Sequence, residues 1–161
     1  MFKRVSLVTA FSLACLLCNS AVAEDFTIGT LKISVPYVRA MVPGAPVGGG
    51  YMTITNTGTT DDRLVTAGSP RAGTVQIHEM KMDNDVMVMR ELANGLTIPA
   101  GKTVALKPGG YHVMFMKVAE PFKQGQVIKS TLTFEKAGTV AIDFPVGPVA
   151  GGTGGHQEIA K

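Results

Sequence analysis

The sequence predicts an all-β fold, a Greek-key β-sandwich of about nine short strands. From Ile28 onward, short runs of β-branched and aromatic residues alternate with glycine and proline. No stretch keeps the apolar period of 3.6 residues that marks an amphipathic helix. Short strands at this spacing are typical of sandwich folds. The expected strands are residues 31–38, 50–56, 63–67, 74–82, 86–92, 103–106, 111–118, 127–134 and 140–145.

The connections between these strands carry turn-forming residues. Pro-Gly pairs begin at Pro43 and Pro108, and an Asp-Asn-Asp run occupies residues 83–85. Proline fixes its own φ, glycine accepts positive φ, and Asn and Asp side chains hydrogen-bond the nearby backbone. We therefore expect one β-sandwich domain over residues 24–146. A flexible, glycine-rich tail is expected over residues 147–161.

The first 23 residues have the pattern of a secretory signal. Lys3 and Arg4 precede an apolar run, and small residues end the segment at Ala23. The run is too short for a stable membrane span, and no other stretch approaches ~20 consecutive apolar residues. Leu17 stands directly before Cys18, where a lipid anchor needs small residues. These features predict a cleaved signal peptide over residues 1–23, a periplasmic location and no stable membrane insertion.

Cysteine content and charge exclude several classes of function. Both cysteines lie inside the segment expected to be removed, so the mature chain has no thiol. It cannot form a disulfide, supply the thiolate of a blue-copper centre, or act as a dithiol reductase. The sequence also offers no plausible Ser-His-Asp set, so we expect no enzymatic activity. Without Lys3 and Arg4 the chain has 13 basic and 12 acidic side chains, which indicates no nucleic-acid partner.

The strand that contains His112 offers two metal donors on one face. Residues two apart on a strand point to the same side of the sheet. His112 and Met114 therefore project together, while Val113 and Phe115 face the opposite side. A His-x-Met strand of this kind presents an imidazole and a thioether to one metal ion.

An expected hairpin supplies two further donors. A turn centred directly after Asp83 would place His78 opposite Met89. In the same register Met80 would lie opposite Met87, one step nearer the turn. A three-residue loop would shift the pairing by one residue and leave His78 diagonal to Met89.

The chemistry of the donors selects the metal. Two imidazoles and two thioethers, without thiolate or carboxylate, leave the charge of the metal uncompensated and so favour a monovalent ion. Thioethers bind Cu(I) well and Zn(II), Mg(II) or Ca(II) poorly. We therefore predict one Cu(I) site. Its candidate ligands are His78, Met89, His112 and Met114, provided that the fold brings the hairpin and the His-x-Met strand together.

The remaining methionines of this region have a structural interpretation. Methionines on the inner faces of strands usually fill gaps in the core. We expect that role for Met80, Met82, Met87 and Met116. Met80 and Met87 are also candidates for outer-shell neighbours of the metal.

At these residues the sequence resembles the periplasmic PCu(A)C-type copper chaperones. The family pattern is a histidine, ten residues, a methionine, about twenty-one residues and then His-x-Met. Here ten residues separate His78 from Met89, and twenty-two separate Met89 from His112. The similarity covers most of the chain after the signal. It extends through residues 38–58, 77–83, 96–116 and 132–138.

The resemblance implies a cupredoxin-like sandwich that binds Cu(I) and passes copper to respiratory haem-copper oxidases. The expected partners are an apo Cu(A) domain or another copper site of such an oxidase, and a Sco-type protein. Some members take up Cu(II) with a His- and Met-rich tail. The tail of this chain contains His156, a candidate extra ligand for Cu(I) or Cu(II). We expect the protein to be a monomer.

Two other functions compete with copper delivery. One is a periplasmic protein that stores or scavenges copper without a dedicated acceptor. The other is a metal-free envelope binding module, which would need the methionines to lie in the core. Exposed methionines should oxidise readily and be protected by Cu(I), whereas buried methionines should do neither.

Overall fold

The computed structural model describes residues 24–149, in which the chain forms eleven strands and no helix. None of these residues therefore belongs to a helix long and apolar enough to cross a membrane. The signal segment 1–23 and residues 150–161, with His156, lie outside the described range. The strands are β1 (Phe26–Ile28), β2 (Leu31–Arg39), β3 (Val47–Asn56), β4 (Asp62–Gly68), β5 (Ala72–Asp83), β6 (Val86–Glu91), β7 (Leu96–Ile98), β8 (Thr103–Leu106), β9 (Tyr111–Val118), β10 (Val127–Phe134) and β11 (Gly138–Gly147).

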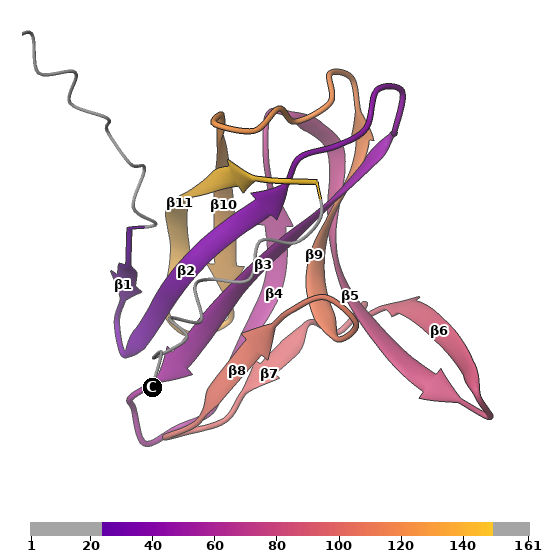
Figure 1. The fold of residues 1–161 in the computed structure, drawn as a ribbon. Helices are drawn as coiled ribbons and strands as arrows, with labels where there is room; N and C mark the ends of the chain where they lie inside the picture. The colour runs from indigo at the N-terminus through magenta and orange to yellow at the C-terminus, as the bar shows by residue number, and fades with distance from the viewer. Residues whose placement is uncertain (1–23, 150–161) are drawn as a thin grey trace, which may run out of the picture.

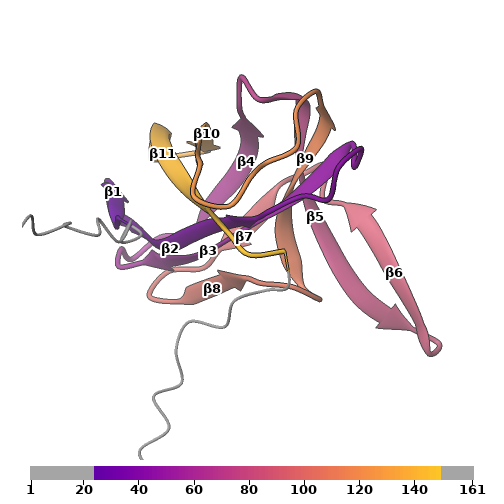
Figure 2. The same ribbon diagram turned by 45° about the horizontal axis from the view of Figure 1, so that its top comes forward.

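The strands form two layers that share β11 (Figure 1). One layer has the order β6-β5-β9-β3-β2, with β8 beside β3 and β1 beside β2. The other has the order β11-β10-β4-β7 and lies across β2 and β3 in Figure 2. The two are joined because Val146 and Gly147 of β11 pair in parallel with Val38 and Arg39 of β2. The predicted all-β sandwich is confirmed.

The core between the layers is built from alternate residues of their strands. Val113 and Phe115 of β9 are fully buried, as the predicted alternation requires. The Phe115 ring contacts Phe122 and Phe144 edge to face, with ring centroids 5.4 and 5.8 Å apart. Burial of one such side chain contributes roughly 1.5–3 kcal/mol. Because this face of β9 is fixed in the core, the opposite face carries the His-x-Met pair outward.

Three strands differ most from the expected ranges, and the bounds of the others lie within two residues of those expected. β1 and β7 have three residues each, too few to show an apolar period, and no strand was expected at either place. β3 begins at Val47, earlier than expected, because its glycines allow close packing on the aromatic core. A Cβ at Gly50 would lie 2.9 Å from the Phe115 ring, and one at Gly48 would lie 3.1 Å from Phe122.

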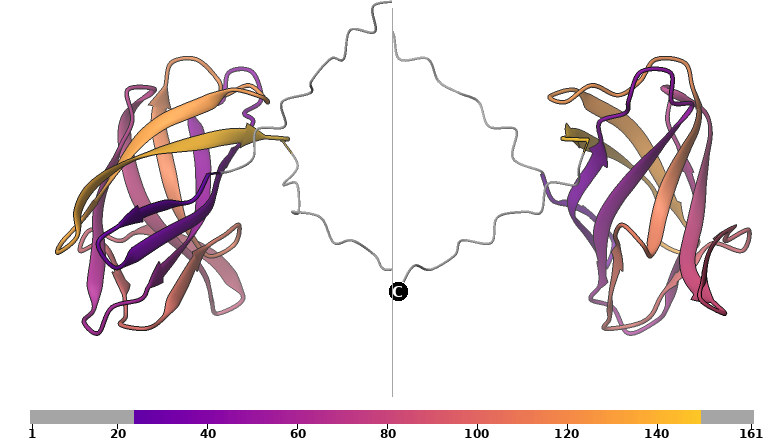
Figure 3. Two further views of the ribbon diagram at one scale, coloured as in Figure 1. Left: turned by 90° about the vertical axis from the view of Figure 1, so that its left-hand side faces the viewer. Right: turned by 45° about the vertical axis from the view of Figure 1, so that its right-hand side comes forward.

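The hairpin of β5 and β6 projects from the body of the sandwich (Figure 1 and Figure 3). Paired residues join β5 to β9 only as far as Glu79 and Tyr111. Beyond them, the Met80 amide donates a hydrogen bond to the Gly110 carbonyl (3.1 Å), and the rest of β5 pairs with β6 alone. β6 is an edge strand whose six residues are all exposed. One end of the hairpin is therefore anchored in the sheet and the other is surrounded by solvent.

Candidate metal centre

Two histidines from neighbouring strands face each other at the base of the hairpin. His78 of β5 and His112 of β9 are directly opposite in the sheet, and their ring centroids lie 5.7 Å apart with the planes inclined by 49°. A metal–nitrogen bond is about 2 Å long, so two imidazoles on one ion have their centroids about 5 to 6 Å apart. The observed spacing therefore fits one ion held between the two rings.

The orientation of the His112 ring is set by its own strand. His112 is 5% exposed, and its Nδ1 lies 3.1 Å from the Gly110 carbonyl oxygen. A carbonyl oxygen only accepts hydrogen bonds, so Nδ1 carries the proton and donates it. The lone pair is therefore on Nε2, which is the atom of His112 available to a metal.

The orientation of the His78 ring is set by two polar side chains that the sequence analysis missed. Gln76 donates from Nε2 to Glu91 Oε2 (3.0 Å), so its Oε1 is left to accept from His78 Nε2 (2.9 Å). His78 therefore carries its proton on Nε2 and its lone pair on Nδ1. That Nδ1 is buried and has no hydrogen-bond partner. A buried, unpaired lone pair beside a second imidazole is the arrangement that a metal ion satisfies.

The environment of His78 also favours the neutral ring that binds metals. Burial lowers the pKa of His78 below its ordinary value of 6.5, and the neighbouring His112 lowers it further. The negative charge of Glu91 acts in the opposite direction but is the smallest of these effects. His78 is therefore a neutral ligand at pH 7, and a proton does not compete for its lone pair.

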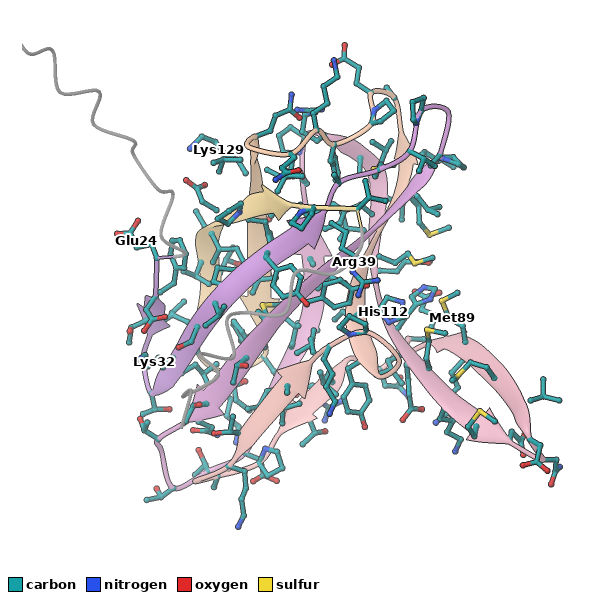
Figure 4. The ribbon with its side chains drawn as sticks, viewed as in Figure 1. Glu24, Lys32, Arg39, Met89, His112 and Lys129 are labelled. Atoms are coloured by element: carbon teal, nitrogen blue, oxygen red, sulfur yellow. The ribbon has the colours of Figure 1, made fainter. Side chains whose placement is uncertain are left out.

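Met114 extends the pair of histidines along β9. It lies two residues from His112 on the outer face and is half-buried. On its other side β3 presents Gly49, where an added Cβ would meet the Tyr51 hydroxyl oxygen at 2.6 Å. The Tyr51 side chain thus covers Gly49, and the Arg39 guanidinium lies 5.4 Å from its ring centroid. Figure 4 shows the labelled Arg39 on the side of His112 away from the hairpin, so Arg39 and the Tyr51 ring that it contacts bound the candidate site there.

The hairpin register differs from the expected one by two residues. His78 lies opposite Glu91, and Met89 lies opposite Met80. The expected pairing of His78 with Met89 is therefore wrong. The turn is centred between Asn84 and Asp85, whose φ angles of 48° and 63° are those of a two-residue hairpin turn. Asn and Asp are the non-glycine residues that best tolerate this conformation, which was the available signal.

The shift by two residues leaves the set of side chains on each face unchanged. Met89 still lies on the face of the two histidines, now diagonal to His78 across β5 and β6. Met80 lies on the same face, two residues from His78 on β5 and directly opposite Met89 on β6. Figure 4 shows the labelled Met89 near His112, at the base of the hairpin. Three adjacent strands thus bring the four predicted ligands to one face.

The expected core role is wrong for two of the other methionines. Met82 is 56% exposed and Met87 is 49% exposed, and they lie opposite each other near the turn. Met80 and Met116 are partly buried, on the outer face of the layer. Met89, a predicted ligand, is 46% exposed. Three methionines of the hairpin, Met82, Met87 and Met89, are therefore surface residues.

Soft donors are needed to complete any site built on the histidine pair. Within residues 24–149 no three His, Cys, Asp or Glu side chains gather closely enough to hold a metal ion. Two imidazoles with neighbouring thioethers match the preference of Cu(I) rather than that of Zn(II) or Ca(II).

A family model and a named relative both match most of the chain. The model of the LpqE-like lipoprotein family matches residues 31–146, from the start of β2 almost to the end of β11. A protein of Leifsonia xyli subsp. xyli (strain CTCB07) that is named as a lipoprotein, Lxx21020, is 34% identical over 121 residues. The alignment covers 75% of this chain and 72% of the relative.

Solved structures with a similar fold include PCuAC domains. The copper-bound PCuAC domain from PmoF2 has a TM-score of 0.66 and 29% identity, over 78% of this chain and 98% of that one. The apo PCuAC domain from PmoF1 has a TM-score of 0.67 and 28% identity, over 78% and 99%. The CuI form of DR1885 from Deinococcus radiodurans has a TM-score of 0.55 and 28% identity, over 80% and 84%. The predicted resemblance to PCu(A)C-type proteins is confirmed.

Proposed function

The chain belongs to the LpqE-like family and has the fold of PCuAC domains, and on this premise we propose that it is a copper carrier. Its cargo is one Cu(I) ion. The proposed ligand atoms are His78 Nδ1, His112 Nε2 and the sulfur atoms of Met114 and Met89.

One observation carries this proposal, the buried Nδ1 of His78 that has no partner beside the His112 ring. A buried polar atom without a partner costs about 1–3 kcal/mol. A chain of hydrogen bonds from Glu91 through Gln76 to His78 fixes the orientation of the His78 ring and so keeps Nδ1 without a partner. A metal ion bound at Nδ1 would remove the free-energy cost of this unpaired nitrogen.

The proposed role is delivery of the ion to another protein. All four ligands are neutral and one of them, Met89, is half exposed, so an incoming thiolate can displace the thioethers one at a time. We propose that the acceptor is the apo Cu(A) domain, or another copper site, of a haem-copper oxidase. A Sco-type protein is the proposed assisting partner. No enzymatic step is proposed.

The proposed location is the periplasm. The lipoprotein names of the family and of the relative support a place outside the cytoplasm. Cleavage after Ala23 would release a soluble protein that begins at Glu24, whereas lipidation would occur at Cys15 or Cys18. The mass of the mature protein and its distribution between membrane and soluble fractions distinguish these two forms.

Anaerobic titration with Cu(I), followed by mixing with an apo Cu(A) domain, tests the function. We expect one tightly held ion per chain and loss of most of the affinity in His78→Ala. After a second Cu(I) ion has been delivered, a mild oxidant that removes one electron from the copper pair should give the Cu(A) absorption in the acceptor. Tight binding without transfer would favour the alternative, storage or scavenging of copper. Equal Cu(I) affinity in a variant that lacks all four ligands would contradict the proposal altogether.

A further inference from the structure

The methionines of the β5–β6 hairpin continue beyond the candidate metal centre toward the turn. Met80 faces Met89 across the two strands, and Met82 faces Met87 one step farther out. All four lie on the same face as His78 and His112, because they alternate with residues of the other face. Only Met89 is used by the proposed function, which leaves an unassigned cluster of three thioethers near the tip.

Packing does not account for this cluster. Met82 and Met87 lie past the last paired residues of β9, where β5 has β6 as its only paired neighbour. They are 56% and 49% exposed, and exposed thioethers contribute little to stability. Leucine or a polar residue would serve equally well in an exposed strand, so the choice of methionine at each position needs a chemical reason.

The two faces of the hairpin differ in the kind of donor that they carry. On the face away from the histidines, Arg90 Nη2 lies 2.7 Å from Glu79 Oε2, and Lys81 and Asp83 continue the row of charges. On the methionine face the residues beyond His78 are neutral thioethers. Among the paired residues from Glu79 to Asp83 and from Val86 to Arg90, the charged side chains thus lie on the face opposite the sulfur atoms, and the methionine face presents soft ligands.

The spacing of the methionines suits a soft ion. Residues directly opposite on two antiparallel strands have Cβ atoms roughly 4.5–5.5 Å apart, and diagonal neighbours roughly 7–8 Å apart. The methionine side chain has three rotatable bonds beyond Cα, so opposite and diagonal sulfur atoms can converge on one ion. The tight turn at Asn84 and Asp85 holds the register that brings them together.

We propose that Met82, Met87 and Met80 form a second Cu(I) site, separate from the site of the histidine pair. It binds the ion through thioethers alone, and more weakly than the inner site because it lacks imidazoles and is open to water. The identity of the ion as Cu(I) rests on the proposed function, but binding at the tip does not require the inner site to be filled. The two sites are adjacent along one face, because Met87 of the tip site lies two residues from Met89 on β6.

A double variant, Met82→Leu with Met87→Leu, tests the second site. Leucine keeps the size and apolar character of methionine, and both positions are exposed, so the fold is retained. Met41→Leu, a half-buried methionine on the loop before β3, is the matched control. Anaerobic Cu(I) titration with mass detection is expected to give two ions per chain in the native protein and in the control. One ion per chain is expected in the double variant, with the affinity of the first ion unchanged.

Methyl NMR of the methionines gives the second readout and separates this proposal from the proposed function. Cu(I) beyond one equivalent should shift the methyl resonances of Met82 and Met87. The same shifts should occur in a His78→Ala, His112→Ala variant at the first equivalent, because the tip remains intact. If the His78→Ala, His112→Ala variant still bound one Cu(I) ion tightly, the proposed function would be contradicted. The second site would not be affected by that result. A native protein that binds one ion without shifts at Met82 and Met87, or a double variant that still binds two ions, would overturn the second site.

Discussion

The histidine pair and the methionine hairpin share one face of the sheet but differ in how firmly their side chains are held. His78 and His112 lie on strands with partners on both sides, and each ring is oriented by a hydrogen bond from one of its nitrogens. The hairpin methionines beyond them lie on a two-stranded ribbon whose outer strand is fully exposed. A fixed pair of imidazoles favours retention of an ion, and mobile thioethers favour its exchange. If the proposed function holds, retention and exchange of the ion are therefore separated along the same strand, β5.

Removal of the histidines should have the largest effect. His78→Ala with His112→Ala deletes both oriented nitrogens, and the loss of Cu(I) affinity should exceed the ~10–100-fold typical of losing an outer-shell partner. Competition with a colorimetric Cu(I) chelator measures it. Circular dichroism serves as the control for folding. A double variant that retained near-native affinity would locate the tight site elsewhere in the chain.

The two proposed thioether ligands should differ from each other. Met114 is half-buried on β9, so Met114→Leu should weaken Cu(I) binding at least about tenfold, or about 1.4 kcal/mol. Met89→Leu should cost less, since Met80 lies directly opposite and its sulfur can replace that of Met89. The same competition assay compares them, together with the Met80→Leu, Met89→Leu double variant. Equal losses of Cu(I) affinity in Met114→Leu and Met89→Leu would contradict the difference proposed between these two thioether ligands.

The positioning of His78 by Gln76 gives a prediction independent of the ligands themselves. Gln76→Leu removes the acceptor of the His78 Nε2 proton, so the ring is free to turn or to change tautomer. Loss of such a partner typically lowers metal affinity ~10–100-fold. Thr74→Val, one step farther along the same face of β5, is the control and should leave the affinity unchanged. In nitrogen NMR of the apo protein, Gln76→Leu should also shift the tautomer balance of His78, which a purely structural role would not change.

Acidity should produce the smallest effect. Burial and His112 lower the pKa of His78, so the native apo protein takes up this proton only below pH 6.5, after the unfolded chain has done so. The contribution of His78 to the free energy of unfolding is therefore complete above the pKa of the unfolded state. It falls as the pH drops from that pKa toward the lower pKa of the folded state. Cu(I) affinity should likewise stay level from pH 8 down to about pH 6.5. An NMR titration of His78 that gave a pKa above the ordinary value would contradict this account.

The positions of the histidines were partly predictable because alternation is a local property of a strand. The burial of Val113 and Phe115 follows from the sequence of β9 alone and puts His112 on the outer face. Register depends instead on the turn, and the correct hairpin required both Asn84 and Asp85 to adopt positive φ. A turn placed one residue too early moved every cross-strand neighbour by two positions.

The dependence on register also explains why Gln76 and Glu91 were not identified from the sequence. Gln76 shares a face with His78 by simple alternation, but it has the appearance of an ordinary exposed polar residue. Its partner Glu91 faces His78 only in the observed register, so the hydrogen-bonded chain from Glu91 to His78 emerges from the structure. The fold class needed less information, since the spacing of turns and short strands is sufficient to predict a sandwich.

Nitrogen NMR of the two imidazoles during an anaerobic Cu(I) titration tests the central claim most directly. One equivalent of Cu(I) should shift His78 Nδ1 and His112 Nε2, while His78 Nε2 and His112 Nδ1 keep the protons that they donate to Gln76 and Gly110. A metal-induced shift at the opposite nitrogen of either ring, or no shift in either, would contradict the account.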